Sequence, residues 1–296
     1  MTSPKPDILC IGSVLWDVIG RAAAPMRLGA DVPGRITRIP GGVAFNIAMT
    51  LARQGLRPVL LTSVGQDDDG DSLLRACKAL GCEVGHVFRS TDLPTDRYMA
   101  IEAANGLIAA IADAHSLEAA GDLILQPLRD GPLGTPQAPY TGMIALDGNL
   151  TESLLAQIAR DTAFAHADLR VVPASPGKAG RLGAFLRAGR GTLYVNLEEA
   201  EILCGAHFAS AAQAGAGLVA RGALRALVTN GAAACCDATA AGVLTCNPPQ
   251  VTVQRVTGAG DTFMAAHMAA ELGGAAPSMA LHRAVEAAAA YVSGAS

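Results

Sequence analysis

The sequence predicts an α/β fold in which a mainly parallel sheet is flanked by helices and carries a small, separate β lid. Three observations support this architecture. After about residue 120, apolar runs typical of buried strands alternate with segments of helical composition, as in a parallel sheet covered on both faces. Hydrophobic residues make up 51% of the 296 residues, which is enough for a large core. Before residue 120, two segments depart from the alternation.

The N-terminal part of the main sheet is predicted from apolar runs and the residues that end them. Residues 7–13 form an apolar run that ends in Gly and Ser, and residues 57–64 form a second run, so both are expected to be buried strands. Residues 43–54 have helical composition and stop at Gly55, as helices commonly do. An acidic loop then leads into a helix that we expect to end at Leu80.

Two segments predict the lid. Residues 14–40 lack a helical period and are rich in proline and glycine, so we expect them to loop out of the main domain. Residues 98–112 contain two apolar runs around Asn105-Gly106, which is a strong hairpin signal. The lid is therefore expected to comprise about residues 14–40 and 95–113.

The C-terminal half supplies the remaining elements. Strands are expected at residues 142–146, 169–172, 192–195 and 226–229, with a hairpin at residues 232–246. Helices are expected at residues 151–160, 178–187, 197–203, 211–221, 259–273 and 277–292. No repeat or low-complexity linker divides the chain, so residues 1–296 are expected to form one domain to which the lid is attached.

Charge and composition exclude several classes of partner. The net charge is −4 and there is no basic run, so no surface for nucleic acid is expected. No apolar stretch approaches the roughly 20 residues that a membrane-spanning helix needs, and residues 1–7 do not resemble a secretion signal. The seven cysteines are scattered, without a C-x-x-C pair, which favours free thiols in a reducing compartment. We expect a cytoplasmic protein that acts on a small molecule.

The most informative local pattern is VTGAGDTF at residues 256–263, directly before an amphipathic helix. Small residues at a helix start let backbone N–H groups approach an anion, and the helix dipole favours negative charge there. Asp261 would accept the proton of a hydroxyl that attacks a phosphoryl group, while the N–H groups of Gly258, Ala259 and Gly260 would stabilise that group. The alternative is an Asp that only stabilises the helix start, after glycines that only form a turn.

Three motifs together resemble the ribokinase-like (PfkB) family of carbohydrate kinases. Residues 256–263 resemble its D-T-x-G-A-G-D motif, residues 40–48 (PGGVAFNIA) its G-G-x-x-x-N segment, and residues 196–199 (NLEE) its N-x-x-E element. The motifs occur in the family's order and at similar separations, and the resemblance spans nearly the whole chain. It implies a ribokinase-like fold and a kinase activity that uses ATP and Mg²⁺.

The resemblance also implies where an acceptor would bind. Gly41 and Gly42 would let a polyhydroxyl substrate approach the backbone closely, and Asn46 would offer a donor and an acceptor to its hydroxyls. Asp17, after the first strand, would accept hydrogen bonds from sugar hydroxyls. The alternatives are that Asn46 is only a polar residue near a helix start, and that Asp17 is a loop residue or a helix cap.

A second set of residues would hold the nucleotide. Asn196 and Glu199 would organise water and Mg²⁺ around the ATP phosphates, with Glu199 binding the metal through water. Thr229 and Gly231 close a late strand and resemble the family's T-x-G near the nucleotide. The alternatives are a plain helix N-cap at Asn196 and a simple turn after Thr229.

One departure from the family pattern concerns Arg255, which stands where the family has an Asp three residues before the first Gly of its late motif. That Asp is not the base, so the chemistry is expected to survive, and K⁺ is the further cofactor that the resemblance leaves open. The pseudouridine kinase branch has a non-acidic residue here, and residues 110–113, 147–150 and 173–178 resemble further segments of that branch. Together these segments favour a C-nucleoside over a free sugar.

The resemblance therefore predicts an ATP-dependent kinase that phosphorylates the 5′-hydroxyl of pseudouridine to give pseudouridine 5′-phosphate. The alternatives are another sugar kinase of the family, acting on ribose, fructose or ketodeoxygluconate, and a non-catalytic protein that senses a sugar or a nucleotide. Residues 35–39 and 98–111 are expected to pair as lid strands and to leave an exposed edge, which predicts a lid-to-lid homodimer.

Overall fold

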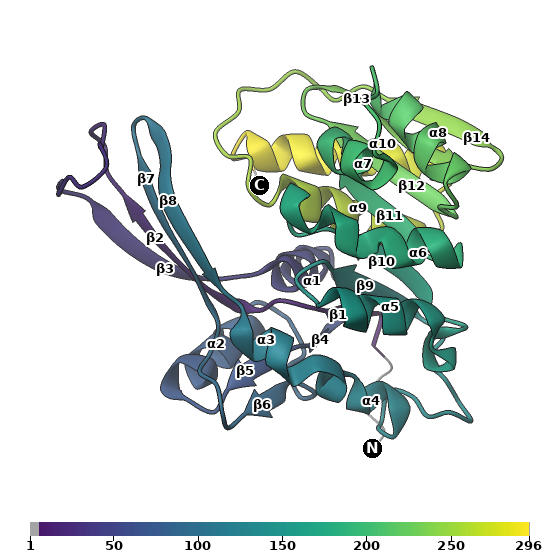
Figure 1. Cartoon of the computed structure of the whole chain (residues 1–296), viewed down its shortest axis with the longest axis horizontal. Helices are drawn as coiled ribbons and strands as arrows, with labels where there is room; N and C mark the ends of the chain where they lie inside the picture. The colour runs from purple at the N-terminus through teal and green to yellow at the C-terminus, as the bar shows by residue number, and fades with distance from the viewer. Residues whose placement is uncertain (1–5, 296) are drawn as a thin grey trace.

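A computed structural model describes residues 6–295 and shows a twisted sheet between layers of helices, with a second sheet projecting from it (Figure 1). In this described part, the main sheet has eight strands in the order β14-β13-β12-β11-β10-β9-β1-β4. They are β1 (Ile8–Ile11), β4 (Pro58–Leu61), β9 (Met143–Asp147), β10 (Asp168–Val172), β11 (Thr192–Asn196), β12 (Arg225–Asn230), β13 (Ala233–Thr239) and β14 (Gly242–Cys246). Neighbouring strands are parallel from β4 through β1, β9, β10 and β11 to β12. Strands β13 and β14 form an antiparallel hairpin at the other edge. Residues 1–5, on which the expectation about a secretion signal partly rests, lie outside the described residues.

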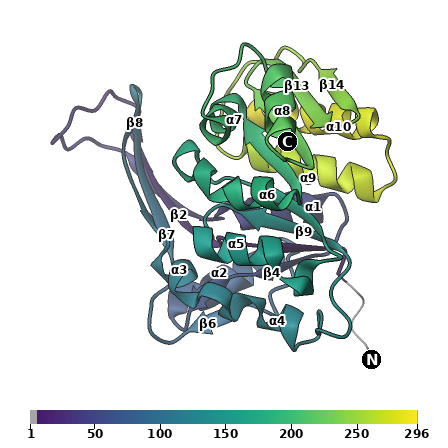
Figure 2. The same cartoon turned by 45° about the vertical axis from the view of Figure 1, so that its right-hand side comes forward.

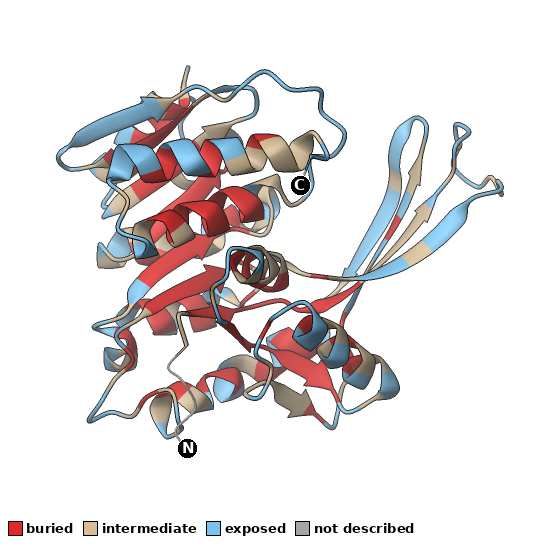
Figure 3. Ribbon diagram, turned by 180° about the vertical axis from the view of Figure 1, so that it is seen from behind, coloured by how far each residue is buried: buried red, intermediate tan, exposed pale blue. Residues whose placement is uncertain are grey.

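The strands are apolar along their length because each of them contributes to two cores. Leu9 and Ile11 of β1 belong to one buried cluster, and Ile8 and Cys10 belong to the other, since successive side chains point to opposite faces. The first face is covered by α3 (His115–Ala120), α4 (Gln126–Arg129), α5 (Glu152–Arg160), α6 (Gly183–Ala188), α7 (Leu197–Cys204) and α8 (Ala211–Ala220) (Figure 2). The second is covered by α1 (Val43–Arg53), α2 (Asp68–Ala79), α9 (Ala259–Leu272) and α10 (Pro277–Val292) (Figure 3).

Most of the predicted elements are confirmed to within a few residues, and two regions differ. Residues 114–141, where no periodic pattern predicts an element, contain α3 and α4. The helix predicted at residues 178–187 is instead a 3₁₀ helix at Pro176–Leu182, followed by the short α6. Glycines at positions 177, 180 and 183 weaken the preference for a regular α-helix here. Within residues 6–295, no helix combines the length and apolarity that crossing a bilayer requires.

The second sheet, in the order β3-β2-β7-β8, corresponds to the predicted lid (Figure 1). Its strands are β2 (Leu15–Arg21), β3 (Arg35–Gly41), β7 (Arg97–Ala103) and β8 (Gly106–Asp113), and a short separate pair is β5 (Ser63–Gly65) with β6 (Phe88–Ser90). Residues 35–39 and 98–111 both lie in the lid sheet, but they do not pair directly, because β2 continues from β1 and lies between β3 and β7. The edges of the sheet are therefore β3 and β8.

The register of the lid sheet assigns its side chains to two faces. Asp17 lies opposite Tyr98, so both project from the same face, since directly paired residues share a face. The next row contains Met99 and Ile111, which project from the other face, where both side chains are exposed. One face of the lid thus carries the Asp17 carboxylate with the exposed Ile39 beside it, and the other carries the exposed Ile36, Met99 and Ile111.

Asp69 attaches the base of the lid to the start of α2. Its carboxylate accepts hydrogen bonds from Arg38 Nη1 at 2.7 Å and from Arg97 Nη2 at 2.5 Å. Its carbonyl oxygen accepts a third from Trp16 Nε1 at 3.0 Å. Because these donors come from β3, β7 and β2, one acidic residue at the start of α2 holds three lid strands.

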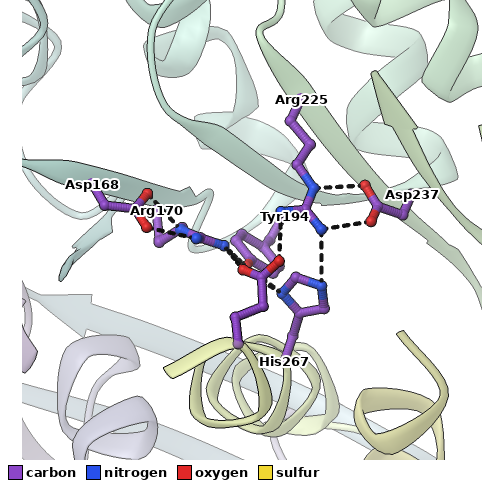
Figure 4. A network of polar contacts seen from close by, with 7 residues as sticks. Asp168, Arg170, Tyr194, Arg225, Asp237 and His267 are labelled. Atoms are coloured by element: carbon purple, nitrogen blue, oxygen red, sulfur yellow. Dashed lines mark hydrogen bonds and ion pairs between the residues drawn. The ribbon is translucent and has the colours of Figure 1, made fainter. Parts of the chain in front are cut away.

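A buried ionic network holds α9 against the strands (Figure 4). Glu271, in the last turn of α9, accepts hydrogen bonds from Arg170 Nη1 at 2.5 Å and from Arg225 Nη1 at 2.7 Å. Arg170 also forms an ion pair with Asp168, and Arg225 forms one with Asp237. Removing Arg225 would leave the buried Asp237 carboxylate without its ion-pair partner, a loss that typically costs about 3–5 kcal/mol.

His267 of α9 lies at the centre of this network and is completely buried. Its Nδ1 is 2.8 Å from Tyr194 Oη, and burial lowers the pKa of the imidazole from 6.5 to about 4. The folded protein therefore keeps His267 neutral in a range of pH where the unfolded chain binds a proton.

We predict that the free energy of unfolding decreases as the pH falls from 6.5 to about 4. The unfolded state binds the proton first, so acidification favours unfolding, by up to about 3 kcal/mol at about 1.4 kcal/mol per pKa unit. Chemical denaturation across this range should show the slope in the wild type and a flatter one in His267→Gln. The exposed His282→Gln is the control and should keep the wild-type slope. An unchanged slope in His267→Gln would contradict the prediction.

Candidate active site

The carboxyl ends of the parallel strands gather most of the residues that the sequence singles out. Asp147 ends β9 and Asn196 ends β11, while Asp17 follows β1. Asp261 enters the same region from the start of α9 and is close enough to Asp147, Asp17 and Glu199 for all three to raise its pKa. The candidate site therefore lies where ligands of open parallel sheets commonly bind.

Asp261 is a fully buried carboxyl group of this cluster with a raised pKa. Burial raises its pKa to about 7, although a hydrogen bond from Asn46 Nδ2 to Oδ2 at 2.8 Å opposes the shift. Its side chain is thus held in a fixed orientation and titrates near neutral pH. These are the properties that a general base requires.

The chain before Asp261 forms a tight helix start. Gly258 is the N-cap residue with a φ of 91°, and a Cβ atom there would lie 2.5 Å from Tyr291 Oη. The Ala259 N–H donates to Val256 O at 3.0 Å. Among the described residues, the N–H groups of Gly258, Gly260 and Asp261 have no such partner, and the space beside Gly260 is open. They are the N–H groups that remain available to an anion at this helix start.

Gly41 and Gly42 are where the lid returns to the main domain. A Cβ atom on Gly41 would lie 2.1 Å from Asp17 Oδ2, so only glycine allows the Asp17 carboxylate to lie over this part of the backbone. Gly42 has a φ of 98°, and a Cβ atom there would lie 2.4 Å from Ser13 O. Burial raises the pKa of Asp17 to about 6. Asp17, Gly41, Gly42 and Asn46 therefore lie in one place.

Asn196 and Glu199 form a capping box at the start of α7. Asn196 Oδ1 accepts from the Glu199 N–H at 2.9 Å, and Glu199 Oε2 accepts from the Asn196 N–H at 2.8 Å. The helix N-cap at Asn196 is thus confirmed. Burial raises the pKa of Glu199 to about 7.

Thr229 and Gly231 lie beside this capping box. Thr229 pairs in register with Asn196, because β11 and β12 are parallel neighbours. Gly231, with a φ of 54°, begins the turn from β12 to β13. Strand order therefore brings Asn196, Glu199, Thr229 and Gly231 together at one end of the site.

Mg²⁺ is the metal that the resemblance implies, and the donors at this end suit an ion held mainly by phosphates. No group of three His, Cys, Asp or Glu side chains suited to a metal is found in residues 6–295. Glu199 uses Oε2 in the capping box and retains a second carboxylate oxygen, a hard ligand of the type that Mg²⁺ prefers. Mg²⁺ usually keeps several waters and binds one or two carboxylates together with substrate phosphates, which agrees with this single carboxylate.

Asp147 and Ser13 are structural residues of the site, and no sequence pattern predicts that they contact each other. Asp147 Oδ2 accepts from the Ser13 N–H at 2.8 Å and from Ser13 Oγ at 2.5 Å. Ser13 Oγ in turn accepts from the Val43 N–H at 2.9 Å. These bonds join the end of β1, the end of β9 and the start of α1. The Gly-Ser that ends the first apolar run was the available signal, but it indicates only the end of a strand.

Arg255 and Tyr291 hold the loop before α9. The Arg255 guanidinium lies 3.9 Å above the Tyr291 ring, and Arg255 Nε donates to Tyr291 O at 2.9 Å. Tyr291 Oη donates to Thr257 O at 2.8 Å. The cationic side chain at the departure from the family motif thus fastens the helix start to the end of α10.

A doubly wound α/β domain with a glycine-rich helix start, a nearby buried carboxyl group and a β lid is the architecture of a small-molecule kinase. The model of the pfkB family carbohydrate kinases matches residues 5–296. The chain belongs to this family, whose members are phosphotransferases that act on sugar hydroxyls.

Relatives and solved structures agree with this assignment. The chain is 32% identical over 199 residues to the uncharacterised sugar kinase YeiI of Escherichia coli (strain K12), covering 66% of this chain and 52% of YeiI. It is 39% identical over 80 residues to the pseudouridine kinase of the same organism, covering 27% of this chain and 26% of that protein. The matches thus span about half and about a quarter of these two relatives.

Solved structures match along almost the whole chain. A carbohydrate kinase from Agrobacterium tumefaciens has a TM-score of 0.81 and 27% identity, covering 96% of this chain and 90% of that one. Arabidopsis thaliana ribokinase complexed with ribose and ATP has a TM-score of 0.78 and 21% identity, covering 98% and 93%. The ribokinase-like fold is thereby confirmed.

Proposed function

We propose that the protein is an ATP-dependent kinase that transfers the terminal phosphoryl group of ATP to the 5′-hydroxyl of pseudouridine. The observation that carries the proposal is the placement of Asp261, which is buried at the glycine-rich start of α9, oriented by Asn46, and has a pKa of about 7. The partial similarity to the pseudouridine kinase of E. coli supports the choice of acceptor, together with the Val256-Thr257 sequence that follows Arg255.

The acceptor would bind between the lid and the start of α1. Asp17, on the lid face that it shares with Tyr98, would accept hydrogen bonds from ribose hydroxyls, and Gly41 and Gly42 would keep the backbone beneath it accessible. Asn46 would contact a hydroxyl while its amide group holds Asp261. The lid face that carries Asp17 and Tyr98 would then meet the base, and closure would exclude water from the reaction.

Asp261 would accept the proton of the 5′-hydroxyl as its oxygen bonds to the terminal phosphorus and the bond to the ADP oxygen breaks. The N–H groups of Gly258, Gly260 and Asp261 would then donate to the transferring group, and Ala259, whose N–H is bonded to Val256 O, would shape the turn that presents them. The helix dipole adds to this stabilisation because the anion lies at the N-terminus of α9.

ATP would lie over β11 and β12, where Asn196, Glu199, Thr229 and Gly231 meet. Mg²⁺, when bound to the phosphates, supplies charge neutralisation, and Glu199 would reach it through water. K⁺ is a further proposed cofactor, for which position 255 supplies no carboxylate ligand. Arg255 stands there, and its guanidinium fastens this loop to Tyr291. We further infer that residues 1–296 act as one kinase domain with lid segments 14–40 and 95–113, in the cytoplasm, where ATP is available and thiols stay reduced.

We infer a lid-to-lid homodimer from exposed apolar side chains on one face of the lid. Ile36, Met99 and Ile111 are exposed by 77%, 50% and 69%, and the lid edges β3 and β8 leave backbone groups unpaired. Burying these side chains against a second copy would remove apolar area from water.

We predict that sedimentation of the wild-type protein at about 10 µM detects a dimer, because exposed apolar strand edges favour association. Ile111→Asp should shift it to a monomer, because a charge on this face would be buried at the interface. Leu224→Asp, at an exposed apolar position outside the lid, is the matched control and should remain dimeric. A monomeric wild-type protein at this concentration would contradict the inferred homodimer.

We predict that kcat/KM rises about tenfold per pH unit up to about pH 7 and then levels off, since Asp261 acts as a base only when deprotonated. Asp261→Asn should fold and bind ATP but lose on the order of 10²–10⁴-fold in kcat. Asp68→Asn, at an exposed position in α2, is the control for a neutralised carboxylate. Near-normal turnover in Asp261→Asn would rule out its role as the base.

We predict that kcat/KM for pseudouridine exceeds that for uridine, ribose, fructose and ketodeoxygluconate when ADP release is measured for all five. Sites that pair with the base edge leave buried polar groups unsatisfied with a smaller acceptor, which can cost about 10⁴-fold or more. If ribose, fructose or ketodeoxygluconate equals pseudouridine, the protein is another sugar kinase. If no acceptor releases ADP although ATP binds, a sensing protein becomes the better description.

A further inference from the structure

Lys178 is a cationic side chain of the site that the proposed function does not use. It lies in the 3₁₀ helix that follows β10, and its Nζ donates to Asn149 Oδ1 at 2.5 Å. Asn149 follows β9, so the contact joins the ends of two neighbouring parallel strands. Lys178 is half-buried, and only its head group reaches this polar edge of the sheet.

Within residues 6–295, no carboxylate lies within ion-pair distance of the Lys178 ammonium, whose hydrogen-bond partner is a neutral amide oxygen. Burial and the neighbouring Arg181 guanidinium lower the pKa of Lys178. Arg181 itself donates to the carbonyl oxygens of Gly148 and Leu150. A partly buried ammonium without a counter-ion is costly, so the position favours an anion that arrives with a ligand.

Strand order places Lys178 between the two halves of the candidate site. The nucleotide half lies at β11 and β12, with Asn196 and Thr229, and the acceptor half lies beyond β1, with Asp17. In the order β12-β11-β10-β9-β1, Lys178 and Asn149 occupy the middle. Lys178 and Asn149 therefore lie, along the edge of the sheet, between the proposed positions of the nucleotide and the acceptor.

The middle of the site also needs positive charge. Asp17, Asp147, Glu199 and Asp261 are near enough to interact electrostatically, and Lys178 feels the charge of Asp147. Burial raises the pKa of Asp17 to about 6 and those of Glu199 and Asp261 to about 7, so these groups are only partly ionised at neutral pH, and those that are ionised would repel a triphosphate. An ammonium at the point of transfer offsets this repulsion where negative charge on the phosphoryl oxygens is greatest.

We propose that Lys178 is a further catalytic residue that binds the terminal phosphoryl group of ATP during its transfer, and that Asn149 is the positioning residue that holds it. The inference rests on the proposed kinase function. Asn149 suits this role because its Nδ2 donates to Ser13 Oγ at 2.9 Å and its N–H donates to Asp147 Oδ1. The ammonium keeps its proton throughout: it donates to non-bridging phosphoryl oxygens, while the acceptor's proton goes to Asp261.

The test compares Lys178→Met, Lys178→Arg and the control Lys78→Met, which removes an exposed lysine in the last turn of α2. Calorimetric titrations of each full-length variant with ATP and with ADP, and turnover with the preferred acceptor, give the readouts. We expect Lys178→Met to lose on the order of 10²-fold in kcat. Its affinity should fall about tenfold for ATP and less than about twofold for ADP, which lacks the terminal phosphoryl group. Lys178→Arg should recover part of the kcat, and Lys78→Met should match the wild type.

Three results would overturn the inference. One is a kcat within about threefold of wild type in Lys178→Met. Another is an equal loss of ATP and ADP affinity. The third is a lowered thermal midpoint in both Lys178 variants without recovery by arginine, which would mean that the lysine only secures the 3₁₀ helix. A wild type that binds ATP but phosphorylates no acceptor would refute the proposed function alone, because the ATP-to-ADP affinity ratio still measures the contact of Lys178.

Discussion

The ion pairs from Glu271 to Arg170 and Arg225 are the contacts on which the rest of the structure depends. They fix the last turn of α9 against β10 and β12, while the first turn of the same helix carries Asp261. A rigid helix that is held at one end has a defined height and rotation at the other end. The network lies far from the reacting groups, yet it determines where the carboxyl group of Asp261 lies relative to Asn46.

A second set of contacts fixes the opposite side of the site. Asp147 joins the end of β1, the end of β9 and the start of α1 through Ser13. Burial raises the pKa of Asp147, hydrogen bonds from donors in these segments oppose that shift, and each bond adds to the rigidity of the acceptor half. The hydrogen bond from Asn46 of α1 to Asp261 of α9 joins the two halves: arginines fix the last turn of α9, and an aspartate fixes the start of α1.

The sequence predicted the elements whose signals are local. Buried strands such as Ile8–Ile11, the hairpin near Gly106 and the helix after Gly258 are found where apolar runs, glycines and helix-start motifs indicate them. Predictions were poorer where local preference is weak. The glycines around Lys178 produced a 3₁₀ helix instead of the expected α-helix, and β2 separated two lid segments whose sequences do not encode their order.

The sequence by itself determined the family motifs, the strand and helix periods and the identity of Asp261 as the candidate base, because each depends on residues that are neighbours in the chain. Only the tertiary structure decided the partners. Asn46 and Asp261 are 215 positions apart, and Ser13 and Asp147 are 134 apart. Lys178 meets Asn149 only because β9 and β10 are adjacent. Such contacts follow from strand order, which results from packing the whole chain into one core and leaves no trace in any short segment.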